Sequence, residues 1–422
     1  MPLSYLPKRE HAMPLGCRAA IGLLMLTLVG QAAAQPAPAP SLTPSAAPAQ
    51  APAPAAAPPP PTPIPYAEAV LKAADDLFSK AKVTGDRVEL VIDPLIDAVS
   101  GAQSTATRNT EKTLIELVQK SYPRFSVQPF NSDTLARNPV VLVGTFTAVN
   151  NQGVASGPRD AFRICFTLAD LASKTVVSKG VSRAKPDGVD TTPTGYFRDA
   201  PVWTKDAATD AYIKTCQGTR LGDTLDPAYV ERLNAAALIS DGILEYEAKH
   251  YREALAFYRT ARQLAGGDQY RVRVGTYLVN SKLGRRDDAV ESFGELVDAG
   301  LGTNQLMVKL LFRPGSTQFV DNPEITQPYP MWLSQIATRA RQKGACLEIV
   351  GHTSRTGMAQ VNERLSVLRA QFVMDLLSTG APESRERIIA SGVGFKENLI
   401  GTGKDDASDA LDRRVEFKVI GC

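Results

Sequence analysis

Histidine is scarce in this chain of 422 residues, and the few histidines lie far apart. They stand at positions 11, 250 and 352, without cysteine or carboxylate neighbours at the spacing of a metal site. Because zinc and related metals are held by clustered imidazole, thiolate and carboxylate ligands, we expect no metal centre. The sequence gives no reason to expect any other cofactor.

The net charge is also small, and common catalytic motifs are absent. The formal charge is only +3, which favours neither a nucleic-acid partner nor a polybasic membrane patch. The chain has no Gly-x-Ser-x-Gly, no phosphate-binding Gly-Lys-Ser/Thr loop and no histidine beside a plausible nucleophile. We therefore predict that the protein is not an enzyme.

Long apolar runs are missing except near the N-terminus. Basic residues precede an apolar run at 19–29, and the small residues Ala32–Ala34 follow it. This order is typical of an export signal, and the run is too short to span a bilayer comfortably. We predict a signal peptide over 1–34, cleaved before Gln35, and no transmembrane span in the mature chain. Cys17 precedes the apolar run, so lipidation there is not expected.

Loss of the signal peptide would leave an even number of cysteines. Cys165 and Cys216 fall in one half of the chain, and Cys346 and Cys422 fall in the other. In an oxidising compartment this favours the disulfides Cys165–Cys216 and Cys346–Cys422. Four cysteines allow three pairings, and free buried thiols are the alternative.

The remaining chain divides by composition into a spacer and three folded regions, a multidomain α+β architecture. Residues 35–65 are almost entirely Ala and Pro, which predicts a semi-rigid polyproline spacer or a disordered leader. Residues 66–226 begin with helical patterns and continue with strands at 87–93, 125–129, 140–149, 162–169 and 174–183. Residues 185–226 read as an irregular, solvated loop.

The order of elements in 66–226, with the phrase Val141-Leu142-Val143-Gly144-Thr145-Phe146, is similar to small periplasmic domains of the TolB N-terminal, CsgG and LpoB type. That resemblance implies a protein-binding α+β domain.

Residues 227–304 are helical and repetitive. The segment 251–258 recurs at 286–293, so that Ala254 and Ala289 correspond. The period is close to that of tetratricopeptide repeats, which the region resembles. Small and aromatic packing residues of that family are matched by Gly242, Tyr246, Ala254, Tyr258, Ala261, Gly284, Ala289 and Phe293. The resemblance implies a groove for protein segments, and a helical spacer is the alternative.

Residues 305–422 are predicted to form the third domain. Strands are expected at 308–312, 346–350 and 413–420, and helices at 329–343 and 359–378. A Gly-rich turn at 351–357 leads into the long helix, whose free N-terminal amides would favour an anion. Asn362 and Arg369 lie two turns apart on one face of that helix, and the planar fork of Arg369 suits a carboxylate. The apolar side of the helix is expected to consist of Val361, Leu365, Leu368, Phe372 and Leu376.

Three separated motifs in this region resemble the C-terminal domain of the OmpA family. They are Gly351-His352-Thr353, Asn362-x-x-Leu365-Ser366-x-x-Arg369-Ala370 and Arg413-Arg414-Val415-Glu416. The resemblance implies an α/β sandwich that holds the diaminopimelate residue of peptidoglycan stem peptides. It assigns the ligand carboxylate to Arg369, and the pocket walls to Thr353, Ser354, Asn362, Leu365 and Arg413.

One departure from the family pattern concerns charge. Ser354 stands where the family has an Asp that faces the ammonium group of the ligand. A hydrogen bond to a charged group contributes about 1.5–3 kcal/mol, so this change weakens the expected site. Asp412 replaces an Asn, and Ser408-Asp409 replaces a Gly-Arg pair. Asp409 or Asp412 is an alternative source of the negative charge.

Together these features predict a non-enzymatic envelope protein in the periplasm, attached to the cell wall, with association to the outer membrane as an extension. Peptidoglycan is the expected ligand of the third domain, and envelope proteins are the expected partners of the other two. The alternative is an interaction scaffold, or a regulator of wall synthesis, whose OmpA-like domain no longer binds peptidoglycan.

Overall fold

The structure is a computed structural model that describes residues 60–422 except 158, 203–204, 381, 400–402, 404–408 and 410–411. The predicted signal peptide and most of the predicted spacer lie outside the described residues. The described end of the spacer is packed against the first domain, because the Ile64 amide donates to the Arg183 carbonyl oxygen over 3.0 Å. No helix among the described residues is both long enough and apolar enough to cross a membrane.

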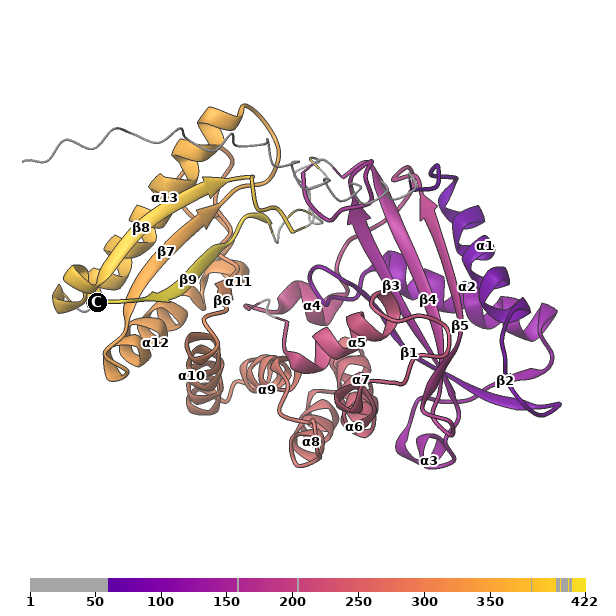
Figure 1. Cartoon of the computed structure of the whole chain (residues 1–422). Coiled ribbons are helices and arrows are strands. Elements are labelled where there is room, and N and C mark those ends of the chain that lie inside the picture. The colour runs from indigo at the N-terminus through magenta and orange to yellow at the C-terminus, as the bar shows by residue number, and fades with distance from the viewer. Residues whose placement is uncertain are drawn as a thin grey trace, which may run out of the picture. The chain divides into compact units, whose positions relative to one another are not determined.

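The first domain is built on a five-stranded sheet with the order β2-β1-β3-β4-β5 (Figure 1). β1 runs parallel to β2 and β3, whereas β3, β4 and β5 are antiparallel. Its elements are α1 (Tyr66–Ser79), β1 (Val88–Asp97), α2 (Thr105–Ser121), β2 (Phe125–Val127), α3 (Ser132–Leu135), β3 (Val140–Val149), β4 (Ala161–Asp170) and β5 (Thr175–Ala184).

Both faces of this sheet are covered, which explains why every residue of the central strand β3 is buried. The helices α1 and α2 pack on one face around Leu77 and Leu114. Tyr212 and Tyr229, which follow β5 in the chain, pack on the other face. Alternate side chains of a strand point to opposite faces, so a strand covered on both sides reads as a continuous apolar run.

The expectation of an irregular loop over 185–226 is wrong. This stretch contains α4 (Gly195–Asp199) and α5 (Ala207–Gln217). The N-terminus of α5 is capped by Asp206, whose carboxylate accepts from the Thr209 amide over 2.8 Å. Polar residues dominate the exposed side of α5, and this hid its buried side from a reading based on composition.

The second region is helical, with α6 (Pro227–Glu231), α7 (Leu233–Glu247), α8 (Tyr251–Arg262), α9 (Tyr270–Lys282) and α10 (Arg286–Gly302). We call α7–α10 the four-helix segment. Tyr258 lies at its centre, fully buried, and a Cβ atom on Gly242 or Gly275 would lie 2.6 or 2.4 Å from its ring. Small residues therefore let the helices close around one aromatic ring. The tetratricopeptide assignment remains a prediction.

Gly284 differs from its predicted packing role. It is exposed and has a φ of +70°, just after α9 ends. Left-handed backbone of this kind favours glycine at helix C-termini. Gly284 therefore ends a helix and does not pack one against another.

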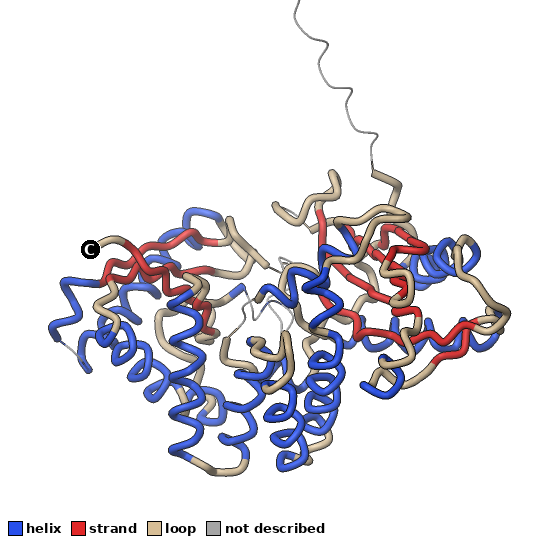
Figure 2. The backbone as a smooth tube through the Cα atoms, turned by 60° about the horizontal axis from the view of Figure 1, so that its bottom comes forward, coloured by secondary structure: helices blue, strands red, loops and turns tan. Residues whose placement is uncertain are grey.

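The third domain is a four-stranded sheet with the order β6-β9-β7-β8. Helices pack against this sheet, as seen beside the strands near the C-terminus in Figure 2. β7 and β8 are parallel, and β9 is antiparallel to both β6 and β7. The elements are β6 (Leu306–Val308), α11 (Pro323–Thr326), α12 (Tyr329–Gln342), β7 (Cys346–His352), α13 (Ala359–Gly380), the 3₁₀ helix η1 (Pro382–Arg387), β8 (Ile388–Gly394) and β9 (Val415–Ile420).

The predicted apolar side of α13 is wrong in part. Val361 and Leu368 are 52% and 40% exposed, whereas Ala370, Val373 and Leu377 are buried. The buried residues of the helix lie along a different stripe from the predicted one. That stripe includes the polar residues Ser366 and Arg369. Hydrophobicity alone therefore misplaced its face.

The two disulfides of the structure are Cys165–Cys216 and Cys346–Cys422, the pairing that the sequence favours. The first joins β4 to α5, and the second joins the start of β7 to the C-terminus.

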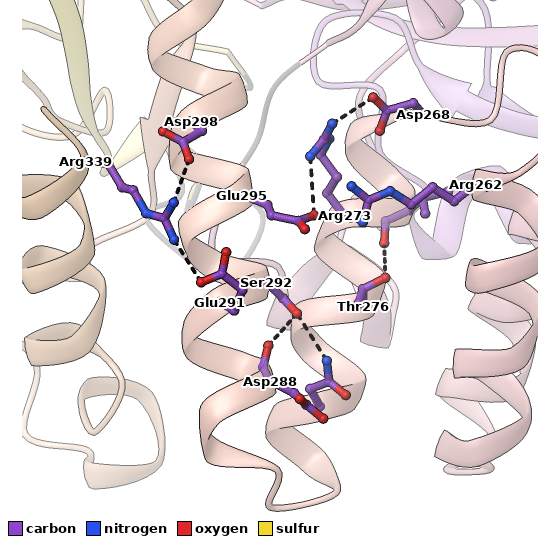
Figure 3. Close-up of polar contacts among 12 residues, drawn as sticks. Arg262, Asp268, Arg273, Thr276, Asp288, Glu291, Ser292, Glu295, Asp298 and Arg339 are labelled. Atoms are coloured by element: carbon purple, nitrogen blue, oxygen red, sulfur yellow. Dashed lines mark hydrogen bonds and ion pairs between the residues drawn. The ribbon is translucent and has the colours of Figure 1, made fainter. Parts of the chain in front are cut away.

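The four-helix segment and the third domain share one hydrophobic core. Trp332 of α12 stacks on Phe293 of α10 with ring centroids 5.6 Å apart, and its indole donates to the Tyr277 hydroxyl over 2.7 Å. Arg339, also on α12, pairs with Glu291 and Asp298 of α10 (Figure 3).

Candidate ligand-binding site of the third domain

The candidate site begins where β7 and β8 end side by side. After β7, the Thr353 amide donates to the Gly394 carbonyl oxygen over 2.9 Å, which keeps the two strand ends together. The chain then turns through 354–358 and enters α13. A helix N-terminus leaves backbone amides free to bind an anion.

Two glycines allow α13 to lie directly on the ends of β7 and β8. A Cβ atom on Gly351 would lie 2.1 Å from the Ser366 carbonyl oxygen, and one on Gly392 would lie 2.3 Å from Ser366 Oγ. Ser366 Oγ in turn accepts from the Gly394 amide over 2.9 Å. This close packing fixes the position of the helix face that carries Asn362 and Arg369.

Asn362 holds the loop between β7 and α13. It is 7% exposed, and its Nδ2 donates to the carbonyl oxygens of Thr356 over 2.7 Å and Met358 over 3.2 Å. Ser354 is 5% exposed, and its Oγ lies 3.4 Å from Thr356 Oγ1. The loop thus brings Ser354 and Asn362 into one neighbourhood, because both contact Thr356.

Arg369 lies two turns further along α13 and is 3% exposed. Its Nε donates to the Ser316 carbonyl oxygen over 3.0 Å, and one terminal nitrogen donates to the Arg313 carbonyl oxygen over 3.1 Å. Its guanidinium carbon lies 4.8 Å from the ring centroid of Phe312. Arg369 therefore secures the 313–316 loop, a role that the sequence alone does not indicate.

The other predicted residues occupy the edges of this neighbourhood. Leu365 is half-buried between Asn362 and Arg369 on α13. Arg413 is half-buried just before β9, and the next residue accepts a hydrogen bond from the His352 amide over 3.0 Å. The segment with Arg413 therefore lies beside the end of β7.

Thr353 carries the most informative polar atom of the site. Thr353 is 2% exposed, and its Oγ1 has no hydrogen-bond partner among the described residues. The Asn398 side chain donates to the Thr353 carbonyl oxygen over 3.0 Å, and Asn398 Oδ1 likewise has no partner in the described part of the chain. Buried polar atoms usually have a partner, so each of these two oxygens can accept a further hydrogen bond.

A buried ion network lies beneath the site. Nε2 of His352 is 3.2 Å from Glu416 Oε1, and Arg414 Nε donates to the same oxygen over 2.9 Å. Burial opposes ionisation of Glu416, but His352 and Arg414 outweigh it and hold the Glu416 pKa at about 2. Burial also lowers the pKa of His352.

The same network contains a possible set of metal ligands. One ligand atom each from His352, Glu397 and Glu416 lies within 4.8 Å of the others. However, Glu416 already pairs with Arg414, and Lys418 lies 3.6 Å from its second oxygen. A cation would have to compete with both basic groups, so we interpret the cluster as an ion-pair network.

Several residues of this region were not singled out from the sequence. Phe312 and the carbonyl groups of Arg313 and Ser316 contact Arg369, and Asn398 contacts Thr353. The turn at Gly315 follows a predicted strand and has a φ of +63°. It was the sequence feature that could have drawn attention to the 313–316 loop. Asp412, noted as a departure from the family pattern, is fully buried and accepts from the Leu399 amide over 2.6 Å.

Comparison with known proteins shows that the similarity lies in the third domain. The model of the OmpA family matches residues 311–411. Outer membrane protein A of Shimwellia blattae is 34% identical over 108 residues, which are 24% of this chain and 44% of the relative. The peptidoglycan-associated lipoprotein of Legionella pneumophila is 37% identical over 75 residues, or 18% of this chain and 41% of the relative.

This chain therefore spans less than half the length of the curated relatives that it matches. Solved structures cover a similar part. The peptidoglycan-associated lipoprotein of Burkholderia pseudomallei is 24% identical and covers 26% of this chain and 88% of its own, with a TM-score of 0.23. The cell wall anchor of the T6SS from Pseudomonas aeruginosa is 28% identical and covers 28% and 80%, with a TM-score of 0.23. Residues 311–411 thus form an OmpA-like domain at the C-terminal end of the chain.

Proposed function

We propose that this chain is a non-enzymatic protein of the cell envelope whose OmpA-like domain binds peptidoglycan. One observation carries the proposal. Asn362 and Arg369 are 7% and 3% exposed on one face of α13, although such side chains on a helix are normally solvated. A buried Asn near the start of α13 and a buried Arg two turns further along the helix suit a small ligand that carries a carboxylate.

The chemistry of the site fits the diaminopimelate residue of a stem peptide. Arg369 and the N-terminal amides of α13 favour the carboxylate of the ligand. Thr353 Oγ1, which has no partner among the described residues, would offer a further hydrogen bond to the ligand. The ammonium group would face Ser354, with negative charge supplied by the buried Asp409 or Asp412 in the segment that leads into β9.

The other regions complete the proposal. The first domain and the four-helix segment would bind proteins of the envelope, in the periplasm and close to the wall. Ser354 also supports a second candidate function. If the missing carboxylate abolishes wall binding, the chain acts as an interaction scaffold or as a regulator of wall synthesis.

Co-sedimentation with purified peptidoglycan sacculi tests the first function. Residues 35–422 should sediment with sacculi, and Arg369→Ala should weaken binding about tenfold or more, since a hydrogen bond to a charged group is worth about 1.5–3 kcal/mol. Arg364→Ala is the matched control, because Arg364 lies on the same helix but is exposed. Thermal unfolding of each variant separates a binding defect from a folding defect.

Ser354→Asp distinguishes the two candidate functions. A wild-type chain that binds sacculi, with little gain from Ser354→Asp, supports the wall-anchor function. A wild-type chain that stays in the supernatant, with binding restored by Ser354→Asp, contradicts it and favours the scaffold. Absence of binding in both chains contradicts the proposed ligand itself.

A further inference from the structure

Residues 195–202 lie against the four-helix segment, although they belong to the stretch that follows the first domain's sheet. This stretch, which we call the inserted segment, comprises α4 and the residues after it. Tyr196, Phe197, Ala200 and Val202 are each 5% exposed or less. All four belong to the hydrophobic core of the four-helix segment and the OmpA-like domain, not to that of the first domain.

Polar contacts of the inserted segment go to α7 and α9. The Tyr196 hydroxyl donates to the Arg271 carbonyl oxygen of α9, and the Tyr196 amide donates to Glu247 of α7 over 3.3 Å. Asp199 accepts from the Tyr246 hydroxyl of α7 over 2.8 Å and lies 3.4 Å from Lys282 Nζ of α9. The segment therefore contacts the first helix of each helical hairpin.

The aromatic contact is equally specific. The Tyr196 ring meets the Tyr246 ring edge to face, with centroids 5.8 Å apart. A cavity of about 30 Å³ lies beside Tyr196, Phe197 and Arg271. Buried aromatic anchors dominate many protein interfaces, and a short helix laid in a hydrophobic groove is a recognised mode of peptide binding.

The far end of the inserted segment reaches the OmpA-like domain. The Lys309 amide donates to the Pro201 carbonyl oxygen over 2.9 Å, and Val202 forms an antiparallel bridge with Val308. Val308 belongs to β6, the edge strand of the sheet. Addition of a short extended segment to a sheet edge is a second recognised mode of peptide binding.

We propose that the inserted segment is an internal ligand of the four-helix segment. It occupies the face that α7 and α9 present, so a protein partner that uses this face has to displace it. The partner that fits is a peptide with an aromatic side chain and, three residues later, an acidic one, as in Tyr196 and Asp199. This inference goes beyond wall binding and does not depend on it.

A displacement experiment tests the proposal. The probe is a fluorescent synthetic peptide with the sequence of residues 194–202, and the protein is residues 35–422. A tethered segment competes at an effective concentration on the order of millimolar, so the wild-type chain should bind the free peptide poorly. The double variant Tyr196→Ala/Asp199→Ala weakens the tethered competitor and should bind the peptide at least tenfold more tightly.

A peptide with alanine at the positions of Tyr196 and Asp199 is the control, and it should bind neither protein. Circular dichroism and intact disulfides verify that the variant is folded. A folded variant that binds the peptide no more tightly than wild type overturns the proposal.

Hydrogen exchange on the wild-type chain provides a second measurement that does not depend on the variant. An internal ligand can detach while the rest of the chain stays folded, so the amides of 195–202 should exchange at least tenfold faster than those of β3. Exchange of both sets at one common rate would show that the segment opens only when the whole chain unfolds, and would also overturn the proposal.

Discussion

Two glycines determine how closely α13 approaches the OmpA-like sheet. At Gly392, an added Cβ would lie 2.3 Å from Ser366 Oγ and 2.4 Å from the backbone nitrogen of Val367. The backbone of α13 cannot move away without breaking the hydrogen bond between Ser366 Oγ and the Gly394 amide. A single methyl group at this position is therefore expected to disturb the candidate site as well as the core.

We expect Gly392→Ala to destabilise the protein by about 1–3 kcal/mol, the usual cost of overpacking. Gly302→Ala is the matched control, because no described atom outside the backbone of α10 and the adjoining residues lies within 4 Å of its added Cβ. Chemical denaturation of both variants measures the difference. Equal stabilities would show that the contact at Gly392 relaxes freely.

The charge on Glu416 makes stability depend on pH. Its pKa in the folded protein is about 2, below the ordinary value of 4.5. The ionised carboxylate therefore stabilises the fold above pH 4.5, and this contribution is lost as the pH falls from 4.5 towards 2. We expect Glu416→Gln to lower the free energy of unfolding by about 1–3 kcal/mol at neutral pH, and by much less near pH 2.5.

Urea denaturation at the two pH values tests this expectation, with the exposed Glu386→Gln as control. A deficit of the same size at both pH values would mean that packing, and not charge, accounts for the effect of Glu416.

At the level of single residues, the sequence drew attention to candidate site residues but did not predict their contacts. The family motifs brought Thr353, Asn362 and Arg369 to attention, and the structure places the first two near the same loop. Helical spacing put Asn362 and Arg369 on one face but did not indicate that this face is buried. The burial of Arg369 depends in part on the 313–316 loop, which is distant in sequence and cannot be seen in the helical pattern of α13.

The helices α10 and α12 are joined by a shared arginine. Arg339 of α12 lies between Glu291 and Asp298 of α10, 3.0 and 2.9 Å from their carboxylates, and its side chain is 20% exposed (Figure 3). A Cβ atom on Gly294 would lie 2.3 Å from the same guanidinium group. Glycine at 294 therefore leaves room for the arginine against the surface of α10.

We expect Arg339→Ala to reduce stability by about 1 kcal/mol, at the upper end for ion pairs that are not fully buried. Lys112→Ala should change stability by much less, because Lys112 and Glu116 are 4.0 Å apart and 78% and 64% exposed. Thermal denaturation at low and high salt measures both. If Lys112→Ala reduced stability as much as Arg339→Ala, the location of the Arg339 ion pairs between two helices would not explain their contribution.

Elements with strong patterns were predicted well, and elements stabilised by distant contacts were not. The apolar run at 140–149 predicted β3 residue for residue. β6 covers only 306–308, whereas a strand at 308–312 was expected, because its pairing with β9 decides where it begins. α4 was missed since its aromatic residues are buried by α7 and α9, which no local pattern records.

At the scale of the whole molecule, the two disulfides differ in accessibility. Cys165 and Cys216 are 3% and 0% exposed, whereas Cys422 lies exposed at the C-terminus. Thiol–disulfide exchange requires access of the attacking thiolate to a sulfur atom. We expect mild dithiothreitol under native conditions to reduce Cys346–Cys422 well before Cys165–Cys216, as measured by alkylation and mass spectrometry.

In denaturant both bonds should be reduced at similar rates, which provides the control. Faster native reduction of Cys165–Cys216 would contradict the difference in burial.

The shared core around Trp332 has a mechanical consequence. The OmpA-like domain follows α10 with only residues 303–305 before β6, and Trp332 stacks on Phe293 across the two regions. A pulling force on this domain would therefore act on the Trp332–Phe293 contact and on the Arg339 ion pairs. It would not first extend a flexible linker. A chain with this construction would transmit displacement of its C-terminal domain directly to the four-helix segment.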